Sequence, residues 1–373
     1  MDLVVKKNDL LRELQLFQGI VERKNTIPIL ANVLMEARGS EIRMLATDLE
    51  VGLRSRCDAV VEKPGTLTLP AKKLYEIVKA LPETDVRIAE DKNGVKVAAD
   101  RFDSRMQTLP KEDFPAVPEA TGTTNAILPR AAVKEMVAKT QFAITGEDTR
   151  FFLNGALFIL GTTSMTLVAT DGHRLALVNV DRPKGSAKPS KDSDEVRAIL
   201  PRKTLWELGK LLTEGDGDVR YERGENHLFF EVGGRMLISR MIDGQFPAYE
   251  RVIPKGNDKH IEFERERLTN AVKRVALLSN ERSRAVKVEI SKGKVEVTSS
   301  SSEFGEAREE LPVDYAGASM KISFNAQYVL DFLNVVETDM VMLSLKDEVS
   351  QAVMKPVGAQ GYDYTYVIMP MRI

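Results

Sequence analysis

The sequence predicts an α+β protein made of three tandem copies of one domain, each with two helices packed on an antiparallel sheet. Its 373 residues are too many for one ordinary domain, which holds roughly 100 to 150 residues. A strand-to-helix segment recurs three times, and a strand-end motif recurs with it. We therefore expect domains at residues 1–121, 122–254 and 255–373.

The strand-to-helix segment is clearest in its first two copies. Residues 69–78 read LPAKKLYEIV, residues 200–209 read LPRKTLWELG, and residues 324–333 (FNAQYVLDFL) repeat the pattern more faintly. Proline stands where the first two helices would begin, a position that needs no amide donor. Apolar residues then recur at helical spacing. Each copy is therefore predicted to be a short amphipathic helix entered from a strand.

A second helix is expected to open each repeat. Asn8 would cap the first of these helices and Pro129 would open the second. Alternating strand-like runs follow them, for example at residues 41–46, 165–169 and 292–297. The apolar faces would comprise Leu10, Leu11, Leu14, Phe17 and Val21 in the first, Val133, Met136, Val137 and Phe142 in the second, and Leu268, Val272, Val275 and Leu278 in the third.

Three segments rich in residues typical of loops lie between these elements. Residues 119–124 and 253–258 contain Pro, Gly, Thr and Asn where one repeat gives way to the next, and they are predicted linkers. Residues 182–195 fall inside the second repeat. This third segment is predicted to be a mobile surface loop.

Charge is balanced over the chain but not along it. Fifty-three basic and 55 acidic residues give a formal charge of −2, whereas a conventional nucleic-acid-binding domain is strongly basic. Five of the six predicted helices nevertheless carry cations on their non-apolar faces, including Lys72, Lys139 and Lys210. A phosphate-facing surface would explain them and predicts sequence-independent, salt-sensitive association. The alternative is that solvated helix faces simply carry lysine.

Cysteine content and hydropathy indicate a cytoplasmic protein. Cys57 is the only cysteine, so the chain can form no intramolecular disulfide and no thiolate metal cluster of its own. The N-terminal residues lack the basic start and apolar region of an export signal. No uninterrupted apolar run reaches the length of about 18 residues that a membrane helix requires.

Enzyme motifs find little support in the sequence. His173, His227 and His260 have no metal-ligand spacing, and nucleophile elbows, phosphate loops and dinucleotide fingerprints are absent. Residues 170–174 (TDGHR) could suggest a catalytic acid and base. However, Thr-Asp occupies the same place at residues 47–48 without a histidine, which favours a shared structural turn. We expect no catalytic residue, metal or cofactor.

Two other classes of function stay open at this point. A hydrolase or transferase could use the same repeated scaffold, because a fold alone does not settle function. A scaffold that binds peptides but never DNA is the second alternative. The single tryptophan, Trp206, lies at an apolar helical position and is predicted to be a core residue.

Several segments spread over the whole chain form a combination typical of one family. They are residues 26–30, 152–155, 169–176, 246–247 and 369–373. With its Thr-Asp-Gly-His-Arg-Leu segment and Met-Pro-Met-Arg ending, the sequence resembles the bacterial DNA polymerase III β subunits, or β sliding clamps. The resemblance implies clamp-type domains, with two subunits closed head to tail into a ring whose helices line the hole. It further implies a non-catalytic DNA sliding clamp, the processivity factor of the replicative polymerase, encircling duplex DNA.

The resemblance also implies a peptide pocket between the second and third domains. Its partners would be the polymerase α subunit, the clamp loader, other polymerases and repair proteins. Leucine, valine and adaptable methionine side chains would form an apolar slot, with His173, Arg174, Arg251 and Asn325 fixing polar groups at its rim. The matching positions are Leu153, Thr170, Gly172, His173, Arg174, Leu175, Pro247, Arg251, Val252, Asn325, Tyr328, Val349, Met369, Pro370, Met371 and Arg372.

Two further sets of positions follow from the resemblance. The DNA-facing set is Lys24, Lys73, Arg150, Phe152 and Lys203. The dimer-interface set is Lys73, Leu74, Met106, Leu277 and Leu278. The alternative for the two adjacent leucines is an ordinary core position, although neighbouring helix residues cannot both face fully inward. Phe151 and Phe152 stand where the family has tyrosines, and Ile373 where it has leucine.

Overall fold

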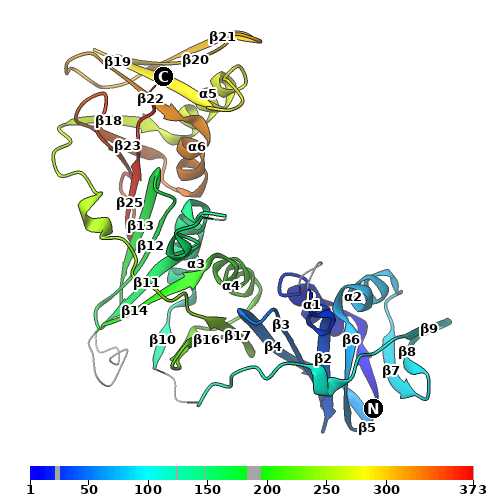
Figure 1. Ribbon diagram of the computed structural model, residues 1–373. Coiled ribbons are helices and arrows are strands. Elements are labelled where there is room, and N and C mark those ends of the chain that lie inside the picture. The colour runs from blue at the N-terminus through cyan, green and yellow to red at the C-terminus, as the bar shows by residue number, and fades with distance from the viewer. Residues whose placement is uncertain (22–25, 123–124, 147, 183–194, 373) are drawn as a thin grey trace. The chain divides into compact units, whose positions relative to one another are not determined.

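The computed structural model describes residues 1–21, 26–122, 125–146, 148–182 and 195–372 (Figure 1). Six α-helices lie within these ranges, two for each predicted repeat, as the sequence indicated. None of them is long and apolar enough to cross a membrane. The helices are α1 (Lys7–Phe17), α2 (Ala71–Ala80), α3 (Arg130–Thr140), α4 (Arg202–Glu214), α5 (Arg265–Ala276) and α6 (Ala326–Val335).

Helix starts and faces depart from the sequence prediction at five residues. Asn8 does not cap α1, because the helix already begins at Lys7 after an extended residue that offers no side-chain cap. Val21, Phe142 and Leu278 lie beyond the ends of α1, α3 and α5, respectively. Trp206 is 46% exposed rather than core. It follows the buried Leu205 by one position, which turns it about 100° away from the apolar face of α4.

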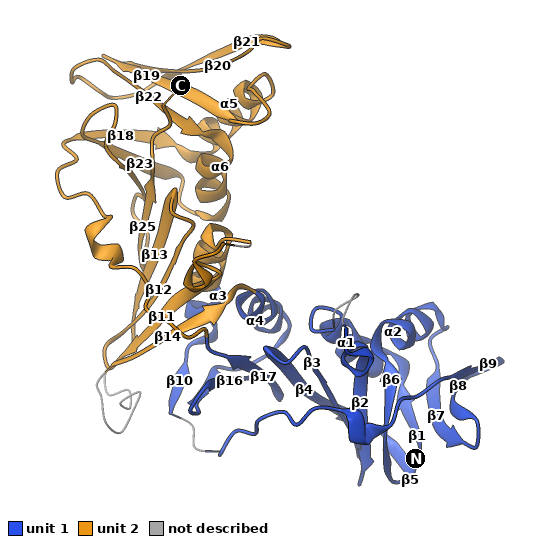
Figure 2. Ribbon diagram, viewed as in Figure 1, with its two compact units in different colours: residues 1–134, 203–241 blue, residues 135–202, 242–373 orange. Residues whose placement is uncertain are grey.

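The chain forms two compact units, residues 1–134 with 203–241 and residues 135–202 with 242–373 (Figure 2). The division falls inside the second predicted repeat, because each unit contains a sheet that continues from one repeat into the next. The predicted domain boundaries therefore stay a prediction. Residues 183–194 of the predicted surface loop, and residues 123 and 124 of the first linker, lie outside the described residues.

Unit 1 contains two antiparallel sheets. The larger has the order β10 (Ala126–Leu128), β15 (Val219–Arg223), β16 (His227–Val232), β17 (Arg235–Arg240), β4 (Val51–Asp58), β3 (Glu41–Thr47), β2 (Asn32–Arg38), β6 (Gly65–Pro70). The smaller has the order β5 (Val60–Lys63), β1 (Asp2–Lys6), β7 (Asp85–Asp91), β8 (Gly94–Ala99), β9 (Phe102–Met106). The first and second repeats meet where β17 pairs with β4, from Met236 opposite Arg54 to Ser239 opposite Val51.

A buried ion pair reinforces this joint in unit 1. Two of the three guanidinium nitrogens of Arg235, on β17, donate to the carboxylate of Glu13 on α1, Nε at 2.8 Å and Nη2 at 2.6 Å. The two side chains are only 8% and 2% exposed. Because an uncompensated charge would be costly there, each residue depends on the other.

Unit 2 repeats this construction. Its larger sheet has the order β14 (Glu195–Pro201), β11 (Gly155–Gly161), β12 (Ser164–Thr170), β13 (Arg174–Asp181), β25 (Asp363–Ile368), β24 (Ala352–Pro356), β23 (Met340–Leu345), β18 (Lys259–Glu264). Its smaller sheet has the order β21 (Gly305–Pro312), β20 (Lys294–Ser301), β19 (Ala285–Ser291), β22 (Met320–Asn325). The second and third repeats meet where β13 pairs with β25, from Arg174 opposite Ile368 to Asn179 opposite Asp363.

A buried cation also stands at the joint in unit 2, which corrects the prediction for Lys139. This residue was expected on an exposed, non-apolar helix face, but it is fully buried. Its Nζ donates to the carbonyl of Val335 at the end of α6 (3.0 Å), pairs with Glu135, and lies 4.6 Å from the ring centroid of Tyr362. Lys139 therefore holds neighbouring repeats together instead of facing solvent.

The two joints follow one rule of strand pairing. Strands β4, β13 and β21 hold equivalent places in the three repeats, and so do β9, β17 and β25. Strand β17 pairs with β4, and β25 pairs with β13. The remaining members, β9 and β21, are edge strands of their sheets. The first repeat therefore leaves β9 unpaired at a sheet edge, and the third repeat leaves β21 unpaired in the same way.

Candidate functional site

The predicted peptide-pocket residues all belong to unit 2, where three segments come together. The C-terminal segment lies against the turn between β12 and β13, because the N–H of Met369 donates to the carbonyl of His173 at 2.9 Å. Two residues later, the N–H of Met371 donates to the carbonyl of Ser323 on β22 at 2.7 Å. The end of the chain therefore connects the β12–β13 turn with the strand that leads into α6.

The turn itself is held by its own side chains. Thr170 Oγ1 donates to the carbonyl of Arg174 at 2.6 Å and accepts from the N–H of Gly172 at 3.1 Å. Asp171 Oδ1 accepts from the N–H groups of His173 and Arg174, at 2.9 and 3.0 Å. Gly172 has a φ of +87°, a left-handed conformation that glycine adopts readily.

The equivalent turn of the first repeat has the same construction. Thr47 Oγ1 donates to the carbonyl of Val51 and accepts from the N–H of Leu49, while Asp48 Oδ1 accepts from the N–H groups of Glu50 and Val51. Leu49 stands in the position of the glycine, at a φ of +81°. The predicted shared structural turn is therefore confirmed.

Arg174 was expected to hold a partner's polar groups, but its side chain is committed within the protein. Nε donates to Asp171 Oδ2 (3.0 Å), Nη1 to Asp331 Oδ2 (2.5 Å) and Nη2 to the carbonyl of Phe142 (2.6 Å). The guanidinium carbon lies 4.3 Å from the ring centroid of Tyr328. Burial opposes the charge, yet Tyr366, Asp331 and Asp171 raise the pKa of Arg174 above its usual range.

Asn325 is likewise occupied in shaping the site. Its Oδ1 accepts from the N–H groups of Gln327 and Tyr328, which caps the first turn of α6. The hydroxyl of Tyr366 donates to the carbonyl of Tyr328 at 2.9 Å. Asn325 and Arg174 thus fix the position of Tyr328, whereas the other predicted rim residues, His173 and Arg251, are exposed.

The apolar residues of the predicted pocket divide into a buried group and an exposed group. Leu153 and Leu175 are buried, and Leu175 packs in a hydrophobic cluster with Phe246 and Val367. In contrast, Val252, Val349 and Met369 are large apolar side chains exposed to solvent, with Val349 66% exposed. Of the remaining predicted positions, Thr170 is buried, Pro247, Pro370 and Met371 are half-buried, and Gly172 and Arg372 are exposed. Large apolar side chains that stay exposed are candidates for an interaction surface.

The predicted DNA-facing residues have unequal surroundings. Lys24 lies outside the described residues. Lys73 is exposed and pairs with Glu76 one helical turn away, at 2.7 Å. Lys203 is half-buried, and its Nζ donates to Asp48 Oδ2 and to the carbonyl of Ile20, at 2.5 and 2.8 Å. The charge of Lys203 is therefore largely compensated within unit 1.

Arg150 and the neighbouring phenylalanines lie beside the β12–β13 turn. Arg150 forms two hydrogen bonds to Asp148, at 3.0 and 2.8 Å, which lower the pKa of that carboxyl to about 2. A Cβ on Gly172 would lie 3.4 Å from the Nη2 atom of Arg150. Phe152 is partly buried against the hydrophobic cluster, whereas Phe151 is exposed. Phe151 is thus the more accessible ring of the two.

The predicted interface residues also differ in exposure. Leu277, the residue that follows α5, is 79% exposed, and Leu278 is half-buried. Leu74 is fully buried in its own chain, and Met106, at the end of β9, is almost buried. Leu277 therefore has the exposure that an interface residue needs, whereas Leu74 offers no exposed surface to a partner, which counts against the prediction for that residue.

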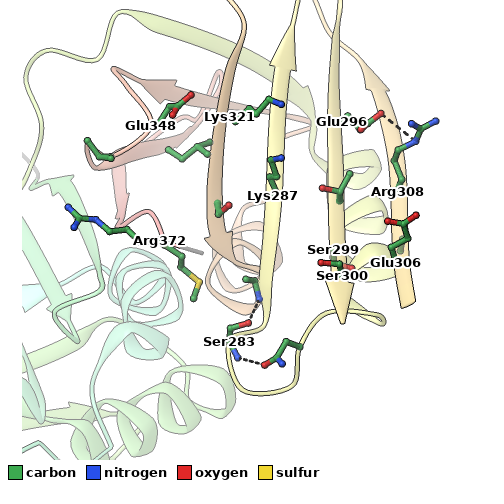
Figure 3. A pocket seen from close by; sticks show the side chains of 18 residues that line it. Ser283, Lys287, Glu296, Ser299, Ser300, Glu306, Arg308, Lys321, Glu348 and Arg372 are labelled. Atoms are coloured by element: carbon green, nitrogen blue, oxygen red, sulfur yellow. Dashed lines mark hydrogen bonds and ion pairs between the residues drawn. The ribbon is translucent and has the colours of Figure 1, made fainter. Parts of the chain in front are cut away.

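Sequence reasoning missed a groove that adjoins the pocket. A hollow of about 1170 Å³ lies over one face of the β19–β22 sheet in unit 2 (Figure 3). Val349, Met371 and Arg372 line one side of it, but Lys287 and Lys321 on its floor belong to no motif. The alternation of charged and apolar residues along β19 was the only signal for this face.

Comparison with known proteins gives a consistent result over the whole chain. Models of the DNA polymerase III beta subunit match residues 1–118 (N-terminal domain), 127–248 (central domain) and 250–372 (C-terminal domain). The Beta sliding clamp of Pseudomonas aeruginosa is 39% identical over 379 residues, covering 100% of both chains.

Solved structures agree. The crystal structure of the DNA polymerase III subunit beta from P. aeruginosa is 37% identical and superposes with a TM-score of 0.91. A sliding clamp from Bartonella birtlesii bound to griselimycin is 35% identical, with a TM-score of 0.92. Each comparison covers 100% of both chains.

Proposed function

Because the chain belongs to the DNA polymerase III β-subunit family of sliding clamps, we propose that two copies close head to tail into a ring around duplex DNA. The ring would make the replicative polymerase processive and would catalyse no reaction itself. Partners would bind at the pocket between the second and third repeats. Such a clamp keeps its hold on DNA by enclosure, so its contacts with phosphates can stay weak.

The two edge strands carry the proposal of a closed dimer. At both internal joints, the strand equivalent to β9 pairs with the strand equivalent to β21. Proteins rarely leave long strand edges open to solvent, because unpaired N–H and C=O groups invite pairing with another chain. Pairing of β9 in one copy with β21 in the other obeys the same rule and removes both edges.

Apolar side chains next to these edges support the same contact. Leu277 follows α5, which packs on β20 and β21, and Met106 is the last residue of β9. Burying an exposed leucine stabilises an association by about 1.5 to 3 kcal/mol. The proposed interface therefore combines strand pairing with a small apolar core.

A charge placed at Leu277 tests this interface. We expect Leu277→Asp to produce monomers in sedimentation velocity experiments, because a buried unpaired carboxylate would oppose association. Val60→Asp is the control, since Val60 is also highly exposed, at 68%, but lies on β5 at the other edge of the β9 sheet. A Leu277→Asp protein that stays dimeric would show that the interface lies elsewhere.

Topological binding has its own test. After loading onto DNA by the clamp loader, the protein should stay on closed circular duplex and slide off once the circle is linearised. The net charge of −2 and the pairing of Lys73 and Lys203 with acidic residues favour loose contact over tight grip. Equal retention on both forms of DNA would contradict enclosure, and failure to bind circles would favour a peptide scaffold that never holds DNA.

The peptide pocket is tested by removing its methionines. In the Met369→Ala/Met371→Ala protein, affinity for a polymerase-derived peptide should fall, because each buried anchor contributes on the order of 2 kcal/mol. The protein should stay dimeric, since Met371 bonds to β22, at the opposite edge of that sheet from β21. Unchanged peptide affinity in fluorescence anisotropy would remove the pocket assignment.

A further inference from the structure

The groove over the β19–β22 sheet has a polar floor for a simple reason. Helix α5 packs on β19, β20 and β21, and Val286, Val288 and Ile290 of β19 are buried. Successive residues of a strand point to opposite faces, so Lys287 and Glu289 turn to the other side. Figure 3 shows Lys287 on the floor of the groove, between β20 and β22.

Three of the seven charged residues that line the groove are neutralised by a neighbour on the same sheet. Lys321 pairs with Glu289 at 3.1 Å, and Arg308 pairs with Glu296 at 3.4 Å. Lys287 is different, because the residues opposite it on the adjacent strands are Ser323 and Thr298.

Two cations are therefore left for a ligand near the end of the chain. Lys287 and Arg372 both line the groove and are exposed, and neither has an ion-pair partner in the described part of the chain. The acidic residues nearest to Lys287 on this sheet face are Glu289, two residues along β19, and Glu296, diagonally across on β20, and both already pair with other cations. Glu306 stands two strands away from Lys287, on β21.

The groove is continuous with the peptide pocket. Val349 and Met371 line the groove and are also pocket positions. The hydrogen bond from the N–H of Met371 to Ser323 places the C-terminal segment along β22, next to the residue that faces Lys287 across the strands. A peptide seated in the pocket would therefore have one of its ends directed over this sheet.

We propose that the groove binds an acidic stretch that flanks the pocket-binding motif of a partner protein, with Lys287 and Arg372 as its cationic contacts. The proposal rests on the proposed function of the pocket and adds a determinant of partner choice. The occupant is an extended peptide, since the groove has a volume of about 1170 Å³ and its floor is an open sheet face. Its carboxylates would compensate the two cations that the sheet leaves without a partner.

Fluorescence anisotropy with two synthetic peptides tests the proposal on the full-length dimer. Both carry the motif of a polymerase subunit, extended by four aspartates or by a Gly-Ser spacer of equal length, and each extension is made at either end in turn. We expect the acidic extension at one end to tighten binding about three- to fivefold in low salt, as exposed ion pairs do. The advantage should shrink as salt is added.

Charge reversal identifies the residue responsible. Lys287→Glu should abolish the advantage of the acidic extension and leave the affinity for the Gly-Ser peptide unchanged. A tetralysine extension should then bind this variant more tightly than wild type. Lys292→Glu is the matched control, because Lys292 is an exposed lysine in the β19–β20 turn outside the groove lining.

The outcomes separate this proposal from the pocket itself. Loss of binding by the Gly-Ser peptide in wild type would overturn the pocket assignment. Equal binding of acidic and neutral extensions at both ends, with the motif still bound, would overturn the groove proposal alone. An acidic advantage that survives Lys287→Glu but disappears in Lys292→Glu would assign the effect to another surface and would also overturn it.

Discussion

The buried pair of Glu13 and Arg235 gives a prediction whose size follows from its burial. Replacing Glu13 with leucine leaves the Arg235 guanidinium uncompensated at a site where it is only 8% exposed. Breaking a buried pair in this way costs about 3 to 5 kcal/mol. We therefore expect Glu13→Leu to lower the free energy of unfolding of unit 1 by this amount.

An exposed pair with the same geometry supplies the control. Arg87 donates to both carboxylate oxygens of Asp2 at 2.9 and 2.6 Å, but the two side chains are 51% and 22% exposed. Solvent compensates either charge when its partner is removed. Arg87→Met should therefore leave the free energy of unfolding almost unchanged. The difference between the two variants isolates the effect of burial.

Urea unfolding followed by the fluorescence of Trp206 is a suitable assay. Trp206 is the only tryptophan and lies on α4 within unit 1. The double variant Glu13→Leu/Arg235→Met removes both charges and should recover most of the lost stability. The reasoning fails if Glu13→Leu costs no more than Arg87→Met, or if the double variant is as unstable as the single one.

Three further predictions follow from the turns and the pocket. Leu49→Gly should raise the free energy of unfolding by about 1 kcal/mol, because a left-handed leucine is strained; an unchanged urea midpoint would argue against strain. Asp331→Asn should loosen Arg174 and weaken peptide binding several-fold while the protein stays dimeric, as measured by anisotropy and sedimentation. The Asp148 carboxyl has a lowered pKa, so the stabilisation from its pair with Arg150 is present above about pH 4 and is lost as pH falls towards 2. Arg150→Met should raise the pKa of Asp148, followed by NMR, towards the value of an unpaired aspartate, about 3.9.

Local features of the fold could be predicted because they depend on neighbours in sequence. Proline after an apolar strand marked the starts of α2 and α4, and Thr-Asp marked both turns. The joints could not be predicted in this way, since β13 and β25 pair across most of two repeats. Lys139 shows the same limit. Its spacing suggested a solvated face, but Val335, 196 residues away, supplies its carbonyl partner.

In the candidate site, too, some features could be predicted from the sequence and others depend on long-range contacts. The resemblance supplied residue identities, and the exposed Val349 and Met369 suit the role that it implied. The interactions of each polar side chain depend on residues that are far away in the sequence. Asp331, 157 residues from Arg174, turns that arginine into a support for Tyr328, and Asp48, 155 residues away, compensates Lys203. Neither ion pair could be predicted from the residues that neighbour it in the sequence.

The duplicated turn limits how many partners one assembly can serve. In the first repeat, the copy built on Leu49 borders a hollow of only about 170 Å³, well below the roughly 300 to 1000 Å³ of ordinary ligand sites. The third repeat has no Thr-Asp at the equivalent turn, between β20 and β21. In the proposed dimer, six repeats would then provide only two partner-binding pockets, one in each subunit. Polymerases and repair proteins would have to take turns, and occupancy would be decided by competition.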